Sequence, residues 1–422
     1  MTARKDEFEE SPLRSEMQAL LERVEGFPES SARRHHFVPA FALAQFARPP
    51  ERKGWLFQLD VRTGRPQRTR PHDVAYEENF YTYTNTEGAP SNTVEAFFAV
   101  VEKHAAGALQ QLRENPLELT PQQRESIAYF LVFQESRTPA GLARSERIRQ
   151  ASLEIRAGLD IGSPEGFRRK YAEAMTANES EDDFEAVRLR MQRQLLDGDV
   201  GFDQPRVGAL HQIIDGAHDL AQTIYDLDWT VLTATDAEFV TSDRPVSMVD
   251  HTPEHPWSGN AWTSSPGAIS FYPLSPSLGL FITPGDPSIG TATSNAEQVR
   301  RLNLMTYGWA DRYIFGASQE TVSLVRRQAK KHPAEVVRRR SNKQVLLFPA
   351  DMQDPAVTAD YARRGWPTQI RVRGDDGQVR VCGYLVIDLD DPAGTAAHAA
   401  TSIAEKFKTS TGDGDPPARA AV

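Results

Sequence analysis

Two adjacent histidines, His35 and His36, are the most unusual local feature of the sequence. Adjacent side chains point in different directions in either a helix or a strand, so one imidazole can face a site while the other packs. Histidine serves as a metal ligand and as a general acid or base, which makes both residues candidate catalytic groups. The structural alternative is the entry to a helix, where an imidazole bonds only to backbone or to a carboxylate.

Asp243 and Ser242 directly follow a segment with strand character. A sheet holds polar groups at its strand ends rigidly, which favours such positions for site residues. Asp243 is therefore a candidate catalytic base or metal ligand. Ser242 is a candidate substrate-binding group, and a role as nucleophile is less favoured because no nucleophile elbow surrounds it. The alternative is a turn in which the Asp243 carboxylate accepts hydrogen bonds from nearby backbone amides.

Three polar residues, Gln134, Arg137 and Thr138, follow the most apolar predicted helical segment, 127–133. Their spacing places them on one helix face, where we expect them to bind substrate. The planar guanidinium of Arg137 suits a carboxylate or a phosphate, which predicts a small anionic substrate. The alternative is an Arg137 that ties the helical part of the chain to the β-rich part through a carboxylate.

A divalent metal ion is the one cofactor that these residue types suggest. Glu77 lies in an aromatic segment and completes a tentative ligand set with His35, His36 and Asp243. The alternative for Glu77 is a loop that packs its aromatic neighbours into the core. The sequence contains no phosphate-binding loop, dinucleotide fingerprint, zincin helix or paired-cysteine motif, so the common nucleotide and zincin mechanisms lack support.

Composition narrows the classes of function. The chain has 422 residues, a formal net charge of −10 and a single cysteine. One cysteine excludes a disulfide framework and is typical of a reducing compartment, so we expect a cytoplasmic protein. The acidic balance counts against a broad nucleic-acid surface, while a local basic patch stays compatible with it. The apolar runs fall far short of the roughly 20 residues that a membrane-spanning helix needs.

Hydrophobic periodicity predicts an α+β protein in which a mainly helical bundle precedes a β-rich mixed unit with antiparallel hairpins. We expect an N-terminal extension over residues 1–32 and a helical unit with an early β-hairpin over 33–226. A β-rich unit over 227–348 packs on the helical unit. A C-terminal hairpin over 349–390 and a disordered tail over 391–422 follow.

Local signals predict a hairpin turn and several element boundaries. They are the turn at 62–64, capping boxes at Asn92–Glu95 and Thr120–Gln123, single helices over 207–226 and 319–340, and a long loop over 250–268.

Six segments taken together resemble the DUF4238 family of bacterial and fungal proteins, whose function is not established. They occur in the expected order over roughly residues 33–317. The segments are His35-His36-Phe37-Val38-Pro39, Val74 to Tyr81, Phe133-Gln134 with Arg137-Thr138-Pro139, Phe239 to Val246, Phe271 to Pro276, and Arg301 to Arg312. The resemblance implies a shared fold and lends no named activity.

Two functions stay open on the sequence alone. The first is a hydrolase that acts on a phosphate or acyl bond at a cleft lined by histidine, aspartate and arginine, in one version nuclease-like or defence-related. The second is a non-catalytic ligand-binding or regulatory module, in which the same polar residues are buried connectors. The sequence does not reveal the oligomeric state.

Overall fold

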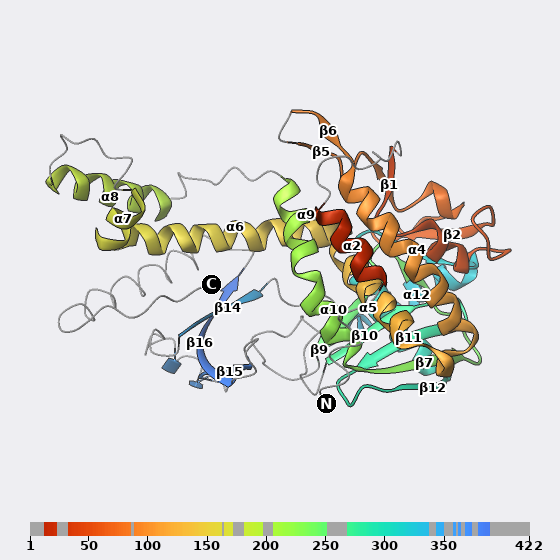
Figure 1. The fold of residues 1–422 in the computed structure, drawn as a ribbon. Coiled ribbons are helices and arrows are strands. Elements are labelled where there is room, and N and C mark those ends of the chain that lie inside the picture. Colours follow the sequence, from red (N-terminus) through yellow and green to blue (C-terminus); the bar gives the residue numbers. More distant parts are fainter. Residues whose placement is uncertain are drawn as a thin grey trace. The chain divides into compact units, whose positions relative to one another are not determined.

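The computed structural model describes most of the chain. The described residues are 12–22, 33–85, 88–162, 164–171, 181–196, 206–250, 268–336, 343–349, 358–359, 362–363, 368–373 and 379–388. The mixed α+β class is confirmed (Figure 1). No helix within the described residues is long and apolar enough to cross a membrane.

The chain divides into two compact units, each described here by itself. Unit 1 comprises Met1–Ser145, Pro205–Pro253 and Ser258–Arg340. Unit 2 comprises Glu146–Gln204, Glu254–Trp257 and Ser341–Val422. Most of the predicted helical range and of the predicted β-rich range thus lie together in unit 1, while residues 146–204 of the helical range and the C-terminal hairpin belong to unit 2.

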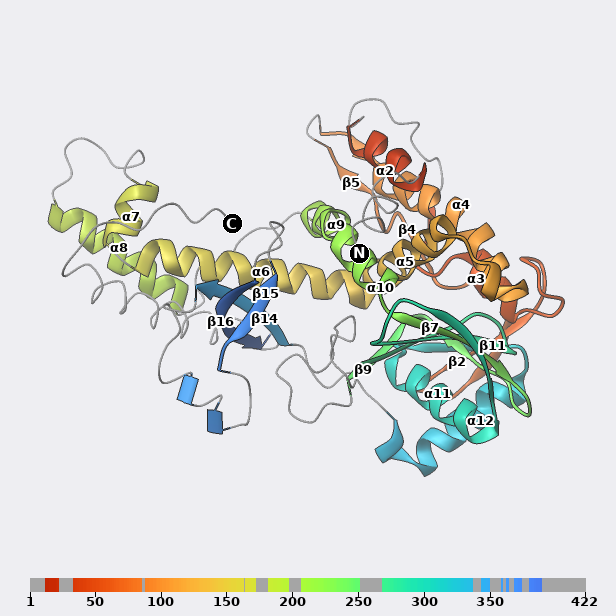
Figure 2. The same cartoon turned by 60° about the horizontal axis from the view of Figure 1, so that its bottom comes forward.

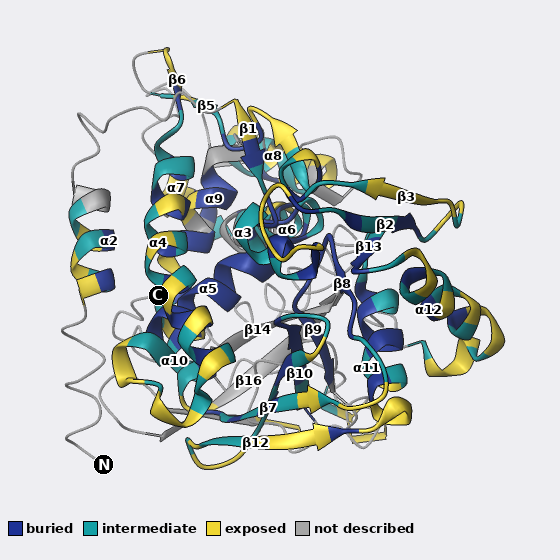
Figure 3. Ribbon diagram, turned by 90° about the vertical axis from the view of Figure 1, so that its right-hand side faces the viewer, coloured by how far each residue is buried: buried dark blue, intermediate teal, exposed yellow. Residues whose placement is uncertain are grey.

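The helices on one side of unit 1 pack around α5, most of whose side chains are buried. These helices are α2 (Pro12–Glu22), α4 (Thr93–Glu114), α5 (Pro121–Ser136), α9 (Arg206–Asp215) and α10 (Ala217–Tyr225). The predicted capping box of Thr120 and Gln123 is confirmed at the start of α5. Because α5 lacks a polar face, it lies in the middle of the core, as its dark blue colour shows (Figure 3).

A five-stranded sheet with the order β12-β7-β11-β10-β9 packs against these helices. Its strands are β7 (Asp228–Ala234), β9 (Ser247–Asp250), β10 (Ala268–Pro273), β11 (Leu278–Thr283) and β12 (Ile289–Ser294). All neighbours are antiparallel except β12 and β7. Phe130 of α5 meets Tyr272 of β10 edge to face, which joins the helical layer to the sheet.

A four-stranded sheet with the order β3-β2-β13-β8 joins segments that lie far apart in the sequence. Its strands are β2 (Leu56–Asp60), β3 (Pro66–Thr69), β8 (Thr241–Ser242) and β13 (Tyr313–Gly316), accompanied by α11 (Ala296–Trp309) and α12 (Gln319–Lys331). Figure 2 shows α11 and α12 across the strands from α4, α5 and α10. The predicted turn at 62–64 is confirmed, and Gly64 adopts the positive φ of 74° that it requires.

Short strands and helical turns complete unit 1. They are β1 (Arg34–His36), β4 (Tyr76–Glu78), β5 (Tyr83–Thr84), β6 (Pro90–Ser91), α3 (Ala40–Leu43), η1 (Ala44–Phe46), η2 (Pro71–Asp73), η3 (Pro116–Glu118) and η5 (Pro333–Glu335). The pair β1–β4 places His35 opposite Glu77 along the backbone.

Unit 2 contains most of α6 together with two further helices and a small sheet. Its elements are α6 (Pro139–Gly162), α7 (Pro164–Tyr171), α8 (Glu181–Leu196) and the antiparallel strands β14 (Lys343–Pro349), β15 (Ile370–Arg373) and β16 (Val379–Asp388). The predicted C-terminal hairpin corresponds to β15 and β16.

One predicted capping box and two predicted helix boundaries are wrong. Asn92 begins α4, but its side chain makes no capping bond and instead accepts a hydrogen bond from Thr82 at 2.5 Å. The helix expected over 207–226 is two helices, α9 and α10, which meet at Gly216. The helix expected to reach residue 340 ends at Lys331, because Pro333 cannot continue it. The loop predicted over 250–268 begins and ends in strand residues, Asp250 of β9 and Ala268 of β10, and its residues 251–267 lie outside the described residues. The predicted turn at 374–377 and the predicted tail at 391–422 also lie outside them.

Candidate functional site

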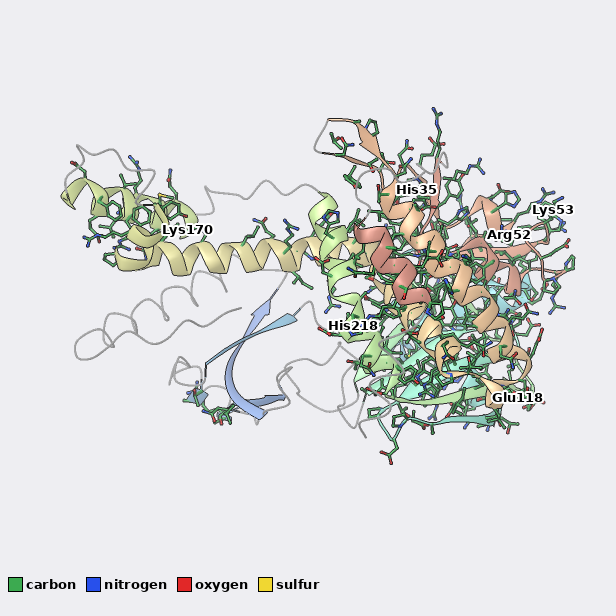
Figure 4. The ribbon with its side chains drawn as sticks, in the orientation of Figure 1. His35, Arg52, Lys53, Glu118, Lys170 and His218 are labelled. Atoms are coloured by element: carbon green, nitrogen blue, oxygen red, sulfur yellow. The ribbon has the colours of Figure 1, made fainter. Side chains whose placement is uncertain are left out.

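His35 is fully buried on β1 and acts as a structural acceptor. Its Nδ1 accepts a hydrogen bond from the backbone N–H of Tyr81 at 2.9 Å. The imidazole also stacks on the Tyr81 ring with a centroid separation of 5.6 Å, and the Tyr81 hydroxyl donates to the backbone carbonyl of Arg137. His35, labelled in Figure 4, thereby connects β1 to the ends of β4 and α5.

His36 faces a different environment, as the alternation along a strand requires. It is half-buried beside Tyr76, and its Nε2 is buried without a hydrogen-bond partner in the described part of the chain. Burial lowers the pKa of His36, and the positive charges of Arg137 and Arg34 act in the same direction. A hydrogen bond to the His72 backbone opposes that shift. A neutral imidazole bonded there through Nδ1 keeps a free lone pair on Nε2.

Gln134 and Thr138 connect backbone segments. The Gln134 amide donates to the carbonyl oxygen of Phe37 at 2.8 Å. The Thr138 hydroxyl accepts a hydrogen bond from the Gly141 N–H and thereby caps the N-terminus of α6. These two predicted substrate-binding residues therefore fix the chain around the end of α5.

Asp243 lies just after β8 and accepts three backbone hydrogen bonds. Asp311 N–H donates to its Oδ1, and the N–H groups of Arg312 and Tyr313 donate to its Oδ2, at 2.8–3.0 Å. Burial raises the pKa of Asp243 to about 7, the Asp311 carboxylate acts in the same direction, and the three donors oppose it. Ser242 accepts from the Arg244 N–H. Ser242 thus holds the turn that follows β8, and Asp243 fastens that turn to the residues at the start of β13.

The four predicted metal ligands do not form a cluster. Within the described residues, no group of three or more histidine, cysteine, aspartate or glutamate side chains is arranged to hold a metal ion. Glu77 is exposed on β4, whereas the buried His35 and Asp243 are engaged by backbone groups in different sheets.

Arg137, at the C-terminal end of α5, keeps two buried donors without a partner in the described structure, besides the unpaired His36 Nε2 and Gln134 Oε1. Its Nη1 donates to Glu102 Oε1 of α4 at 2.8 Å, and its guanidinium lies over the Phe98 ring. Its Nε and Nη2 are buried and have no partner in the described structure. Because Nε–H and one Nη2–H of a guanidinium point the same way, Arg137 presents an unoccupied two-donor edge.

Glu95 belongs to the same cluster. It lies two helical turns before Glu102 on α4, and the charges of both Arg137 and Glu102 act on it. Burial raises the pKa of Glu95 to about 7, Glu102 adds to the shift and Arg137 opposes it. No hydrogen bond or ion pair of Glu95 is found among the described residues. Glu95 is thus poised to exchange a proton near neutral pH.

A family model described as a protein of unknown function, DUF4238, matches residues 34–320. The match covers more than half of the chain and every predicted site residue. The chain belongs to the DUF4238 family. No curated protein and no solved structure matches it.

In this DUF4238 protein, sequence reasoning missed Glu95 and Glu102. The sequence pattern assigns Glu95 only to a capping box with Asn92 and does not single out Glu102. Their spacing of seven residues, beside the apolar stripe of α4, was the available signal, because such residues share a helix face. With Arg137 and His36, they form what is called here the Arg137 cluster.

Proposed function

We propose that this DUF4238 protein is a hydrolase of acyl bonds, and that the Arg137 cluster (His36, Glu95, Glu102 and Arg137) is its acid–base site. The observation that carries the proposal is the unoccupied Nε/Nη2 edge of the buried Arg137. Leaving two guanidinium donors unpaired in a protein interior is costly, which favours a ligand oxygen that accepts from both.

The local charge favours an acyl group over a phosphate. Glu102 already neutralises Arg137, and Glu95 adds negative charge when it ionises. A phosphate would bring further negative charge that no group of the cluster offsets. A neutral ester or amide carbonyl accepts from the Arg137 edge without adding charge.

The cluster has the parts for acid–base hydrolysis. Ionised Glu95 takes a proton from a water molecule, whose oxygen forms a bond to the acyl carbon. The Nε and Nη2 groups of Arg137 donate to the carbonyl oxygen as it gains negative charge. The bond to the leaving group then breaks, and the proton held by Glu95 passes to the leaving oxygen or nitrogen. Neutral His36 accepts from the attacking water through Nε2.

Access from solvent is consistent with this role. The Glu102 side chain is 28% exposed while that of Arg137 is 3% exposed, so the cluster runs from the surface into the interior. His36 and Glu95 are half-buried at the same cluster.

Hydrolysis of p-nitrophenyl esters with acyl chains of increasing length tests the proposal, with p-nitrophenyl phosphate run in parallel. We expect turnover of at least one ester, and kcat/KM that rises with pH through about 7, as Glu95 ionises. Glu95→Gln should lower kcat by roughly 100-fold or more. Asp286→Asn, in an exposed turn, serves as the control and should leave kcat unchanged.

Two results would overturn the proposal. One is a folded wild-type chain that hydrolyses none of the esters. The other is ester turnover that persists in folded Glu95→Gln with the same pH profile. Hydrolysis of p-nitrophenyl phosphate but of none of the esters would favour a hydrolase of phosphate bonds instead.

A non-catalytic ligand-binding module is the second candidate. It is favoured by the backbone contacts of His35, Gln134 and Asp243, which act as the structural connectors that this hypothesis expects. Under it, the Arg137 edge holds a small ligand and no bond is broken. A carboxamide or ester that raises the Tm of the wild type without being consumed, and loses that effect in Glu95→Gln, would favour this candidate.

A further inference from the structure

One surface of unit 1 is strongly basic although the whole chain is acidic. Residues 51–73 and 319–331 carry ten lysines and arginines against four carboxylates, in a chain with a net charge of −10. The cations are called here the basic face: Arg52, Lys53, Arg62, Arg65, Arg68, Arg70, Arg326, Arg327, Lys330 and Lys331. They come from the β2–β3 hairpin with its flanking residues and from α12.

The hairpin part of the basic face is organised around Trp55. The guanidinium of Arg68 lies 4.2 Å from the centroid of the Trp55 ring, and that of Arg70 lies 4.5 Å from it. Arg68 pairs with Phe57 in the β2–β3 register, and residues alternate between faces along a strand. Trp55, Phe57, Arg68 and Arg70 therefore belong to one side of the hairpin.

The α12 part adjoins that same side. Val322 and Val325 of α12 pack on Leu59, which shares the hairpin face of Phe57. Arg326 lies directly against the turn, because a Cβ atom added to Gly64 would meet its guanidinium carbon. Figure 3 shows α12 and β3 beside β2, with exposed surface on both. The cations of the hairpin and of α12 thus come from neighbouring elements of unit 1.

The cations of the basic face are not paired with carboxylates in the described structure. None of its ten cations makes an ion pair with a carboxylate among the described residues. Nearby arginines behave differently: Arg312 pairs with Asp60, and Arg300 pairs with Glu297 and Glu335. Arg52 and Lys53 extend from the same end of unit 1 (Figure 4). Uncompensated cations repel each other and favour a polyanionic partner.

We infer that the basic face binds the phosphates of a double-stranded nucleic acid. Two guanidinium groups cover Trp55, so its ring is not open for the base stacking that single strands use. The remaining groups are exposed arginines and lysines, which contact phosphates and carry no base specificity. Binding is therefore independent of sequence and weakens as salt rises, since it depends on the release of counterions.

Fluorescence anisotropy with a labelled duplex of about 20 base pairs tests this inference on the full chain. The triple variant Arg327→Gln, Lys330→Gln, Lys331→Gln removes three exposed cations from the face. The matched control is Lys170→Gln, Arg190→Gln, Arg193→Gln, which removes three exposed cations from unit 2. Circular dichroism checks that both variants stay folded.

We expect the wild type to bind the duplex at about 50 mM salt and the face variant to bind roughly tenfold or more weakly. The plot of log K against log salt should become less steep by about 0.9 for each lost phosphate contact. The unit 2 control should bind like the wild type.

Three results would overturn the inference. The wild type does not bind the duplex at low salt, or the face variant binds as well as the wild type, or the control weakens binding equally. Tighter binding of a single strand or of polyglutamate than of the duplex would assign the face to that partner instead. None of these results bears on the esterase assay, so the two proposals fail separately.

Discussion

The Nη1 of Arg137 donates to Oε1 of Glu102 across 2.8 Å, from the end of α5 to the middle of α4. Only one edge of the guanidinium is used in this contact, and its remaining donors are buried beside Glu95 and His36. The pair therefore does two things. It fastens two core helices, and it holds the free edge of Arg137 in a fixed orientation.

Removing the Glu102 charge should destabilise the fold. In Glu102→Gln the guanidinium of Arg137 stays buried without its counter-charge, so we expect the free energy of unfolding to fall by about 2–4 kcal/mol. Urea denaturation measures it. Glu297→Gln is the control, because Glu297 pairs with two arginines at the surface and its loss should change stability little. Equal effects of the two substitutions would contradict the buried role of Glu102.

Glu95 should give the protein a measurable pH dependence of stability. Burial raises its pKa from 4.5 to about 7, so the folded chain holds this proton more tightly than the unfolded chain. The resulting stabilisation is complete below about pH 4.5 and is lost as the pH rises to about 7. Glu95→Gln cannot ionise, so above about pH 7 it should be more stable than the wild type by about 2–3 kcal/mol.

Urea unfolding at a series of pH values tests this prediction. The curves of the wild type and of Glu95→Gln should separate as the pH rises and approach each other near about pH 4.5. Glu118→Gln, at the exposed residue labelled in Figure 4, should follow the wild-type curve throughout. Parallel curves for Glu95→Gln and the wild type would show that Glu95 titrates normally.

The adjacent histidines should differ in their contribution to stability. His35→Phe keeps a ring against Tyr81 but removes the acceptor of the Tyr81 N–H, which should cost about 1–3 kcal/mol. His36→Phe should cost less, because His36 is half-buried and its Nε2 has no partner to lose in the described structure. Thermal and urea unfolding compare the two variants directly. A larger loss of stability in His36→Phe than in His35→Phe would contradict the prediction that His35 contributes more to stability.

Much of the local structure follows from the sequence because its causes are local. Thr120 and Gln123 cap α5 through contacts within four residues, and Gly64 supplies the positive φ of its turn. The predicted box at Asn92 fails for the opposite reason. Thr82, from a strand region ten residues earlier, takes the Asn92 side chain, and Glu95 turns toward Arg137.

The site was less predictable because its partners lie far apart in the chain. The sequence singled out Arg137, with the alternative that it ties the helical part of the chain to the β-rich part through a carboxylate. Arg137 does pair with a carboxylate, but that carboxylate is not in the β-rich part. Glu102, on a neighbouring helix, pairs with Arg137. The tie from α5 to the β-rich part is made two residues away, by Glu135 and Arg244 at 2.9 Å. Residue types indicate which groups need partners, whereas only the tertiary packing of α4 on α5 supplies them.

Asp243 should prove structural in a direct test. In Asp243→Asn one oxygen becomes an NH₂ group, which then faces at least one of the backbone donors of residues 311–313. Placing a donor against a buried donor should lower the free energy of unfolding by about 2–3 kcal/mol. The comparison is best made at about pH 5, below the Asp243 pKa of about 7, because ionisation of the buried carboxyl at higher pH destabilises the wild type and reduces the difference.

Asp243→Asn also distinguishes a structural role of Asp243 from a catalytic one. Because the Asp243 carboxylate is occupied by backbone amides, ester turnover per folded molecule should equal that of the wild type, while the Tm falls. The exposed Asp286→Asn should change neither quantity. A folded Asp243→Asn protein with lost turnover would instead return Asp243 to the catalytic role that its position after a strand suggests.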